Sequence, residues 1–162
     1  MSSFNRRILL SSLVALGACG FQPAYGPKGG AQALRGRVLF ADPGNENDFA
    51  LLRRLEERLG RPEAPLYRLS YRLSVTEEGL AITPAQETTR YNVLGKADFS
   101  LTEIATGRVV LSGAVDNFTS YSATGTTVST QTAKRDSYAR LMVILADRIV
   151  GRLLGVDLGA AK

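Results

Sequence analysis

The chain has no histidine and no tryptophan, and it has a single cysteine among its 162 residues. Histidine is the commonest general base in enzymes and the commonest ligand for transition metals. A serine or cysteine nucleophile activated by histidine therefore cannot be built from this sequence, and a metal would have to be held by carboxylates alone. We expect a protein that is not an enzyme and that needs neither a cofactor nor a metal, although serine–lysine chemistry through Lys96 or Lys134 stays formally open.

The lone cysteine, Cys19, lies directly behind an apolar N-terminal stretch. Arg6 and Arg7 precede an aliphatic run over residues 8–16, and Gly17 and Ala18 lead into the cysteine. A basic start, an apolar run and small residues before a cleavage point form the layout of a secretory signal peptide. The run is too short for a membrane span, which needs about 20 apolar residues. We therefore predict a signal peptide over residues 1–18.

The tetrapeptide Leu16-Gly17-Ala18-Cys19 resembles the lipobox of bacterial lipoproteins. The resemblance implies cleavage before Cys19, an S-diacylglycerol group on its thiol and an N-palmitoyl group on its amine, which would anchor the chain to a membrane. The residue after the cysteine is Gly20 and not aspartate. By resemblance to lipoprotein sorting in enteric bacteria, this residue favours an anchor on the periplasmic side of the outer membrane. An ordinary signal peptide with an incidental cysteine, or a short membrane anchor, is the alternative interpretation.

The sequence after Cys19 divides into a linker and one domain. Residues 19–35 are rich in glycine and proline, which is typical of an extended linker, so we predict a lipidated flexible tether there. Residues 36–158 have apolar patterning throughout, and their length suits a single domain with its own core. The formal charge of +5 is modest, and no basic run interleaved with aromatic residues suggests nucleic-acid binding.

The first half of the domain predicts a strand followed by a helix. Residues 37–41 form a short apolar run bounded by glycine and proline, which is typical of a buried strand. Asn45 or Asn47 can cap a helix that Gly60 and Pro62 would end. Apolar residues recur at helical spacing along that segment, namely Phe49, Leu52, Leu55 and Leu59, with Leu51 widening the stripe.

Three further strands are predicted from alternation of apolar and polar residues. They cover residues 67–75, 91–102 and 108–117, with a hairpin turn at 105–107. The polar face of this sheet is a candidate surface for a partner or an anionic amphiphile, with an ordinary solvated face as the alternative. It carries Arg68, Arg72, Arg90, Asn92, Lys96, Asp98 and Arg108, beside Leu94.

Residues 119–132 are rich in serine and threonine, and we interpret them as a polar loop rather than as an extension of the strand. The longest helix is expected over residues 133–154, with a broad apolar stripe that includes Leu141, Leu145 and Ile149. The resulting order is strand, helix, three antiparallel strands and helix. It predicts an α+β two-layer sandwich, with a four-stranded, mostly antiparallel sheet and two helices packed on one face.

Several motifs together resemble a known family. Residues 19–25 (CGFQPAY), Tyr91-Asn92-Val93 and Phe99-Ser100-Leu101 with Thr106-Gly107 are similar to the lipopolysaccharide-assembly lipoproteins of the LptE family, of the alphaproteobacterial type. The late segments 137–140 (SYAR) and 145–149 (LADRI) resemble the final helix of that family. The resemblance covers nearly the whole chain after Cys19.

The resemblance implies an outer-membrane lipoprotein that plugs and helps to assemble the LptD β-barrel translocon. It also implies contact with lipopolysaccharide on its way to the cell surface. Lipid A carries phosphates, so the resemblance and the residue types together suggest Arg90, Lys134 and Arg135 as lipopolysaccharide contacts. Three other interpretations stay open: an auxiliary lipoprotein of an ABC-type lipid transport system, a lipid-anchored hydrolase, and a tethered scaffold without a ligand.

Overall fold

The computed structural model describes residues 30–82 and 88–156 of the chain. The predicted signal peptide, Cys19 and residues 19–29 of the predicted tether lie outside the described residues. In chain order the elements are α2 (Gly30–Leu34), β1 (Val38–Phe40), α3 (Glu46–Leu59), β2 (Tyr67–Ile82), β3 (Thr88–Glu103), β4 (Val109–Ser122) and α4 (Thr127–Leu154).

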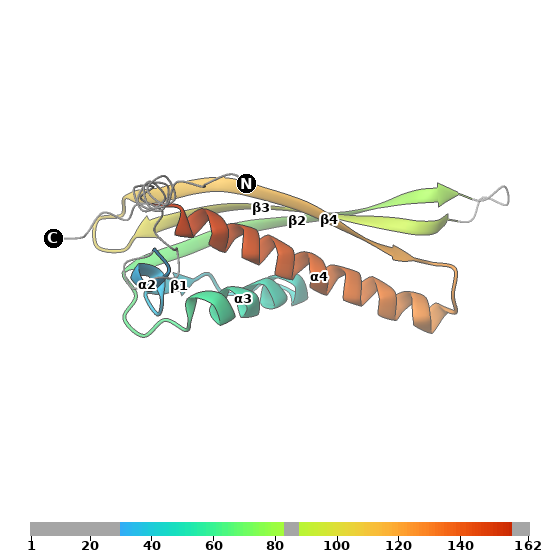
Figure 1. Ribbon diagram of the computed structural model, residues 1–162, viewed down its shortest axis with the longest axis horizontal. Helices are drawn as coiled ribbons and strands as arrows, with labels where there is room; N and C mark the ends of the chain where they lie inside the picture. Colours follow the sequence, from blue (N-terminus) through green and yellow to red (C-terminus); the bar gives the residue numbers. More distant parts are fainter. Residues whose placement is uncertain (1–29, 83–87, 157–162) are drawn as a thin grey trace, which may run out of the picture.

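The four strands form one mixed sheet in the order β1-β2-β3-β4. The short β1 is parallel to β2, whereas β2, β3 and β4 form a long antiparallel meander. Figure 1 shows α3 and α4 on the same face of this sheet, with α4 running obliquely along it. The predicted α+β two-layer sandwich, with a four-stranded sheet and two long helices on one face, is therefore confirmed.

The core lies between the sheet and the two long helices. Alternate residues of β2 and β3 point into it, and Leu69, Val93 and Leu101 are fully buried there. The predicted stripe of α4 is confirmed, since Leu141, Leu145 and Ile149 are also fully buried. No helix in the described part of the chain is long and apolar enough to cross a membrane.

Helix α3 begins and ends where the sequence predicts, but its buried face is rotated. The side chain of Asn45 accepts a hydrogen bond from the amide of Asp48 at 3.0 Å, and Gly60 ends the helix with a φ of 78°. The buried residues are Leu51, Leu55 and Leu59, whereas Phe49 is 59% exposed. The predicted stripe beginning at Phe49 was therefore wrong in its first residue, because the helix directs the 51–55–59 row against α4.

The prediction of a polar loop over residues 119–132 is wrong. β4 continues to Ser122, with Thr119 opposite Val93 and Tyr121 opposite Tyr91, and α4 already starts at Thr127. The threonines suit this arrangement, because β-branched residues favour strands and threonine can cap a helix. Thr126 does so by accepting a hydrogen bond from the amide of Ser129 at 3.3 Å.

The domain also extends beyond the predicted boundaries on two other sides. Residues 30–34, predicted as part of the tether, form the short helix α2, and its Leu34 is fully buried in the core. Strand β2 runs to Ile82 rather than ending at residue 75, and β3 begins at Thr88. The β2–β3 hairpin consequently projects well past the start of α3, at the right of Figure 1. The predicted turn at 105–107 is confirmed, with a φ of 70° at Gly107.

Candidate functional site

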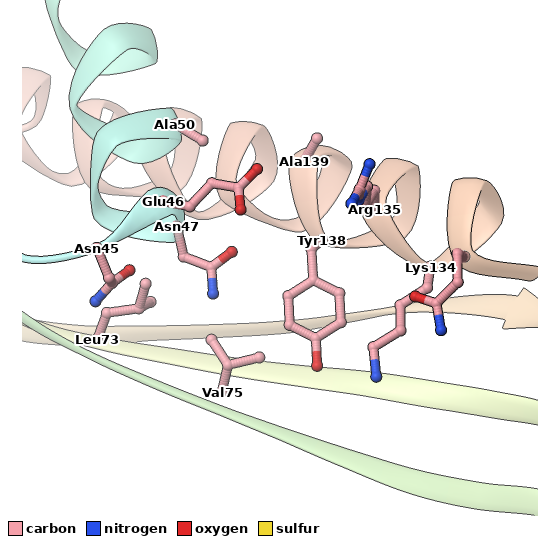
Figure 2. A pocket seen from close by; sticks show the side chains of 11 residues that line it. Asn45, Glu46, Asn47, Ala50, Leu73, Val75, Lys134, Arg135, Tyr138 and Ala139 are labelled. Atoms are coloured by element: carbon pink, nitrogen blue, oxygen red, sulfur yellow. The ribbon is translucent and has the colours of Figure 1, made fainter.

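A groove of about 550 Å³ lies between β2, the start of α3 and the first half of α4. It exists because α3 begins only at Glu46, so the inner face of β2 beyond Tyr71 has no helix directly over it. Figure 2 shows side chains from all three elements directed into this space. The apolar wall includes Leu73, Val75 and Ala50, and the polar rim includes Asn45, Asn47, Glu46, Gln131, Lys134 and Arg135.

The Glu77 carboxylate lies beyond Val75 on the same face of β2 and gathers three partners. Its Oε1 accepts a hydrogen bond from the Tyr121 hydroxyl at 2.6 Å, and its Oε2 accepts one from the Tyr138 hydroxyl at 3.0 Å. The Lys134 ammonium is 2.8 Å from the same Oε2 and 5.8 Å from the centre of the Tyr138 ring. Tyr121 in turn stacks on Tyr91, with ring centres 5.3 Å apart. We call these five residues the Glu77 cluster.

Electrostatics within the Glu77 cluster favour a charged carboxylate. Partial burial on its own raises the pKa of Glu77, but the hydrogen bonds from Lys134, Tyr121 and Tyr138 outweigh it and hold that pKa below its usual value. The hydrogen bond to Glu77 raises the pKa of Lys134. Burial, followed by the hydrogen bond to Glu77, raises the pKa of both Tyr121 and Tyr138. The cluster therefore holds a carboxylate and an ammonium with protonated phenols.

The three candidate lipopolysaccharide contacts occupy different environments. Lys134 and Arg135 both line the groove, but only the Lys134 side chain points toward the sheet in Figure 2, and it is already paired with Glu77. Arg135 is exposed and has no ion pair within residues 30–82 and 88–156. Arg90 lies on β3 opposite Ser122, exposed, on the face of the sheet that points away from the helices. The structure thus brings Lys134 and Arg135 together and separates Arg90 from them by the thickness of the sheet.

The outer face of the sheet has the polar character that the alternation predicts, with one apolar spot. Lys96 pairs with Asp98 at 3.1 Å, and Arg68 and Arg72 are exposed on β2. Leu94 lies opposite Phe118 of β4, which is 60% exposed, and both line a depression of about 400 Å³. Arg108 lies at the β3–β4 turn, where it is 3.6 Å from Glu103.

The Glu77 cluster was not anticipated from the sequence. Glu77 and Glu78 are adjacent, so on a strand their side chains point to opposite faces, and Glu77 continues the inward positions of Tyr71, Leu73 and Val75. The site could have been found from that period of two, because it places the Glu77 carboxylate on the apolar face of the strand. A carboxylate on the core-facing side of a sheet needs partners, and the three partners of Glu77 come from β4 and α4, far away in the sequence.

No family model matches this chain, and no curated protein matches it. Solved structures do share its fold. A candidate lipoprotein from Caulobacter crescentus aligns with a TM-score of 0.62 at 21% identity, covering 77% of this chain and 93% of that one. Rare lipoprotein B from Shewanella oneidensis aligns with a TM-score of 0.56 at 14% identity, covering 72% and 91%. Lipoprotein B from Nitrosomonas europaea, an uncharacterized protein, gives 0.57 at 11% identity, covering 73% and 81%. These similarities show the fold.

Proposed function

We propose that this protein is a lipid-anchored protein of the outer membrane. In this role it plugs an LptD-type β-barrel, helps that barrel to assemble and contacts lipopolysaccharide during delivery to the cell surface. The observation that carries the proposal is the shared fold: the same two-layer architecture occurs in solved lipoproteins over most of both chains. The lipobox at Cys19 and the family motifs in the hairpin and the last helix support the same assignment.

The shape of the domain suits a plug. Helix α4 has 28 residues, which corresponds to a length of about 42 Å at 1.5 Å per residue. It packs against α3, β3 and β4, so one rigid unit extends along the whole sheet. A rigid body of this kind can fill the lumen of a wide barrel without losing much conformational entropy on binding. The proposed work is done by surface contacts, and the proposed role is not catalytic.

The exposed arginines are the best contacts for the phosphates of lipid A. Guanidinium groups bind phosphate in a bidentate manner, and Arg90 and Arg135 have no ion pair within the described part of the chain. Lys134 is committed to Glu77, so its proposed role is to hold the start of α4 in place beside Arg135. This ranks Arg90 and Arg135 above Lys134 as direct contacts.

Two experiments test the proposal. The intact lipidated protein is isolated from outer membranes with a mild detergent, and the proposal expects a large β-barrel to co-purify with it. Co-purification with an inner-membrane permease would instead support the auxiliary protein of an ABC-type transporter. In the second experiment, lipopolysaccharide binding is compared for Arg90→Glu, Arg135→Glu and Arg53→Glu. Arg53 is exposed on α3 and serves as the matched charge-reversal control. Equal binding by all three variants would contradict the proposed contacts.

A further inference from the structure

The sheet has a long open edge on β2. Strand β1 pairs with Tyr67, Arg68 and Leu69, so from residue 70 onward β2 has no neighbouring strand on that side among residues 30–82 and 88–156. The Leu69 carbonyl accepts from Ala41 on the β1 side, whereas the Leu66 carbonyl accepts from Ile104 on the opposite side. Because peptide groups alternate in direction along a strand, Leu73, Val75 and Glu77 direct their N–H and C=O groups to the open side. These groups make no backbone hydrogen bond to another element within the described residues.

The opposite edge of the same sheet is protected. β4 is the last strand of the sheet in the described part of the chain, and its outward carbonyls belong to even-numbered residues. Two arginines of α4 cap two of these carbonyls: Arg148 donates to the Asp116 carbonyl at 2.6 Å, and Arg140 donates to the Ser120 carbonyl at 3.3 Å. Charged side chains at an edge are a usual device against unwanted strand pairing. The edge of β2 from Leu73 to Glu77 has no such cap in the part of the chain that the structure describes.

The open edge lies directly beside the groove. Leu73 and Val75 line that groove, and no residue of β3 or β4 does, so the groove opens under the edge strand itself. A strand added next to β2 would turn alternate side chains toward Leu73, Val75 and Ala50. Backbone groups for pairing and an apolar space for every second side chain are the two requirements of peptide recognition by strand addition.

Exposed arginines on both sides of the edge can bind acidic side chains of a partner. Arg72 is exposed on the outer side of β2, and its cross-strand neighbour Asp98 is already paired with Lys96. Arg135 is exposed at the rim of the groove on the inner side, whereas Lys134 is neutralised by Glu77. One arginine that makes no ion pair with a described residue therefore lies on each side of the edge. Glu46 at the rim and the exposed Glu78 are the acidic groups nearby.

We propose that the β2 edge from Leu73 to Glu77 binds an extended segment of a partner protein by strand addition, and that this segment alternates apolar and acidic residues. The apolar side chains enter the groove, and the acidic side chains contact Arg72 on the outer side. This site goes beyond the proposed contacts with lipopolysaccharide. Arg135 is shared with those contacts, so the test relies on the backbone of β2 and on Arg72.

The probe is a synthetic peptide of about eight residues that alternates glutamate and valine, the length of an ordinary strand. Its binding to the mature lipidated protein in detergent is measured by fluorescence anisotropy. A peptide with the same side chains and N-methylated alternate amides is the control for backbone pairing. A peptide that alternates lysine and valine is the control for charge. We expect each control to bind at least about tenfold more weakly, a difference of about 1.4 kcal/mol.

Two variants locate the binding site. Val75→Pro removes one amide that faces the open edge without touching the ladder to β3, and it should weaken binding of the glutamate–valine peptide at least about tenfold. Ala114→Pro removes an outward amide from β4, the protected edge, and should leave binding unchanged. Arg72→Glu should weaken the glutamate–valine peptide and strengthen the lysine–valine peptide, which a variant that merely unfolds cannot do.

Amide hydrogen exchange measured by NMR completes the test. Without peptide, the amides of Leu73, Val75 and Glu77 should exchange fast and those of Ser74 and Thr76 slowly, and peptide should slow the first set only. Protection of the first set without peptide at every concentration would mean that the chain itself covers the edge. Protection that grows with protein concentration would mean that a second copy covers it. Either result, or equal binding of the N-methylated peptide, overturns the proposal.

Discussion

Both long edges of the sheet, on β2 and on β4, have backbone groups that no neighbouring strand pairs with in the described part of the chain. Side chains of α4 cap such groups on β4, whereas those on β2 stay open. On β4, α4 runs close enough for Arg140 and Arg148 to reach the outward carbonyls of Ser120 and Asp116. On β2, α3 starts too late to cover Leu73 and Val75, and a groove remains where a helix would otherwise pack. An unpaired strand edge favours aggregation, and this is why we propose that the open edge beside the groove binds a partner. Protection of each sheet edge in this fold therefore depends on where the neighbouring helix begins.

The largest effect is expected where α4 crosses the sheet. An added Cβ at Gly95 would lie 2.9 Å from a methyl of Leu141 and 3.0 Å from a methyl of Leu145. Gly95→Val should therefore destabilise the protein by about 3 kcal/mol, because overpacking under a helix forces both partners to move. Urea unfolding followed by circular dichroism measures this loss. Gly151→Val on the exposed side of α4, where an added Cβ meets nothing within 4 Å, is the control. Equal stability of the two variants would contradict the close approach of α4, on which the capping of the β4 edge depends.

The Glu77 cluster adjoins the groove, because its Lys134 and Tyr138 also line that groove. Glu77→Gln should cost about 1–2 kcal/mol, because the hydrogen bonds to a charged acceptor become weaker and Lys134 loses its partner. The pKa of Glu77 is lowered on folding, so its charge stabilises the native state above the unfolded-state pKa, near 4.5, and this contribution is lost as the pH falls through the folded-state value. Wild type should lose more stability than Glu77→Gln between neutral and acidic pH. A parallel decline of the two in chemical denaturation would argue against the cluster.

Thr126 caps the start of α4, the helix that carries the arginines protecting β4. Thr126→Ala removes the side chain that accepts a hydrogen bond from the Ser129 amide, and we expect a loss of about 1 kcal/mol. Thr127→Ala, one residue further on and already inside the helix, is the matched control and should be nearly neutral. Thermal unfolding of both variants tests this prediction, and an equal effect of the two would show that the cap contributes nothing.

The smallest change in stability is expected from removing Arg140 and Arg148, which cap carbonyls on the edge of β4. These variants also test directly whether the two arginines protect that edge. Arg140→Ala with Arg148→Ala should cost only about 0.5–1 kcal/mol in total, because both bonds are exposed to solvent. The uncapped β4 edge should then self-associate, which sedimentation velocity detects as a shift to larger species. Arg53→Ala with Arg58→Ala on α3 is the control pair. If the β4 variant stays as monomeric as the control, the two arginines do not protect that edge.

Much of the fold could be predicted because its elements have strong local signals. The alternation around Tyr67, Leu69 and Leu101 and the helical repeat of Leu141, Leu145 and Ile149 each specify an element and its buried face. The segment around Thr119 and Thr126 lacked such a signal, because a serine- and threonine-rich stretch suits a loop, a strand or a helix cap equally well. Its pairing with β3 is a long-range interaction that local patterning does not show.

The candidate site was predicted only in part. Lys134 and Arg135 were identified by resemblance and residue type, and the structure places both at the groove. The ion pair between Lys134 and Glu77 could not be inferred, because the two residues are far apart in the sequence and no spacing rule connects a strand to a distant helix. The outer-face position of Arg90 followed from alternation alone, since Val93 is buried in the core and Tyr91 packs against it.

The sequence by itself determined most of the strands and both long helices, the buried stripe of α4 and the inward positions of the meander, because these are local patterns of residue type. It also places a lone cysteine behind an apolar N-terminal run. Only the tertiary structure decided which charges are free, which sheet edge is capped and where a groove remains. These properties depend on the distances between elements that are far apart in the sequence and adjacent in the fold. A shift of one helical turn at the start of α3 or α4 would change them, without altering the pattern of apolar residues.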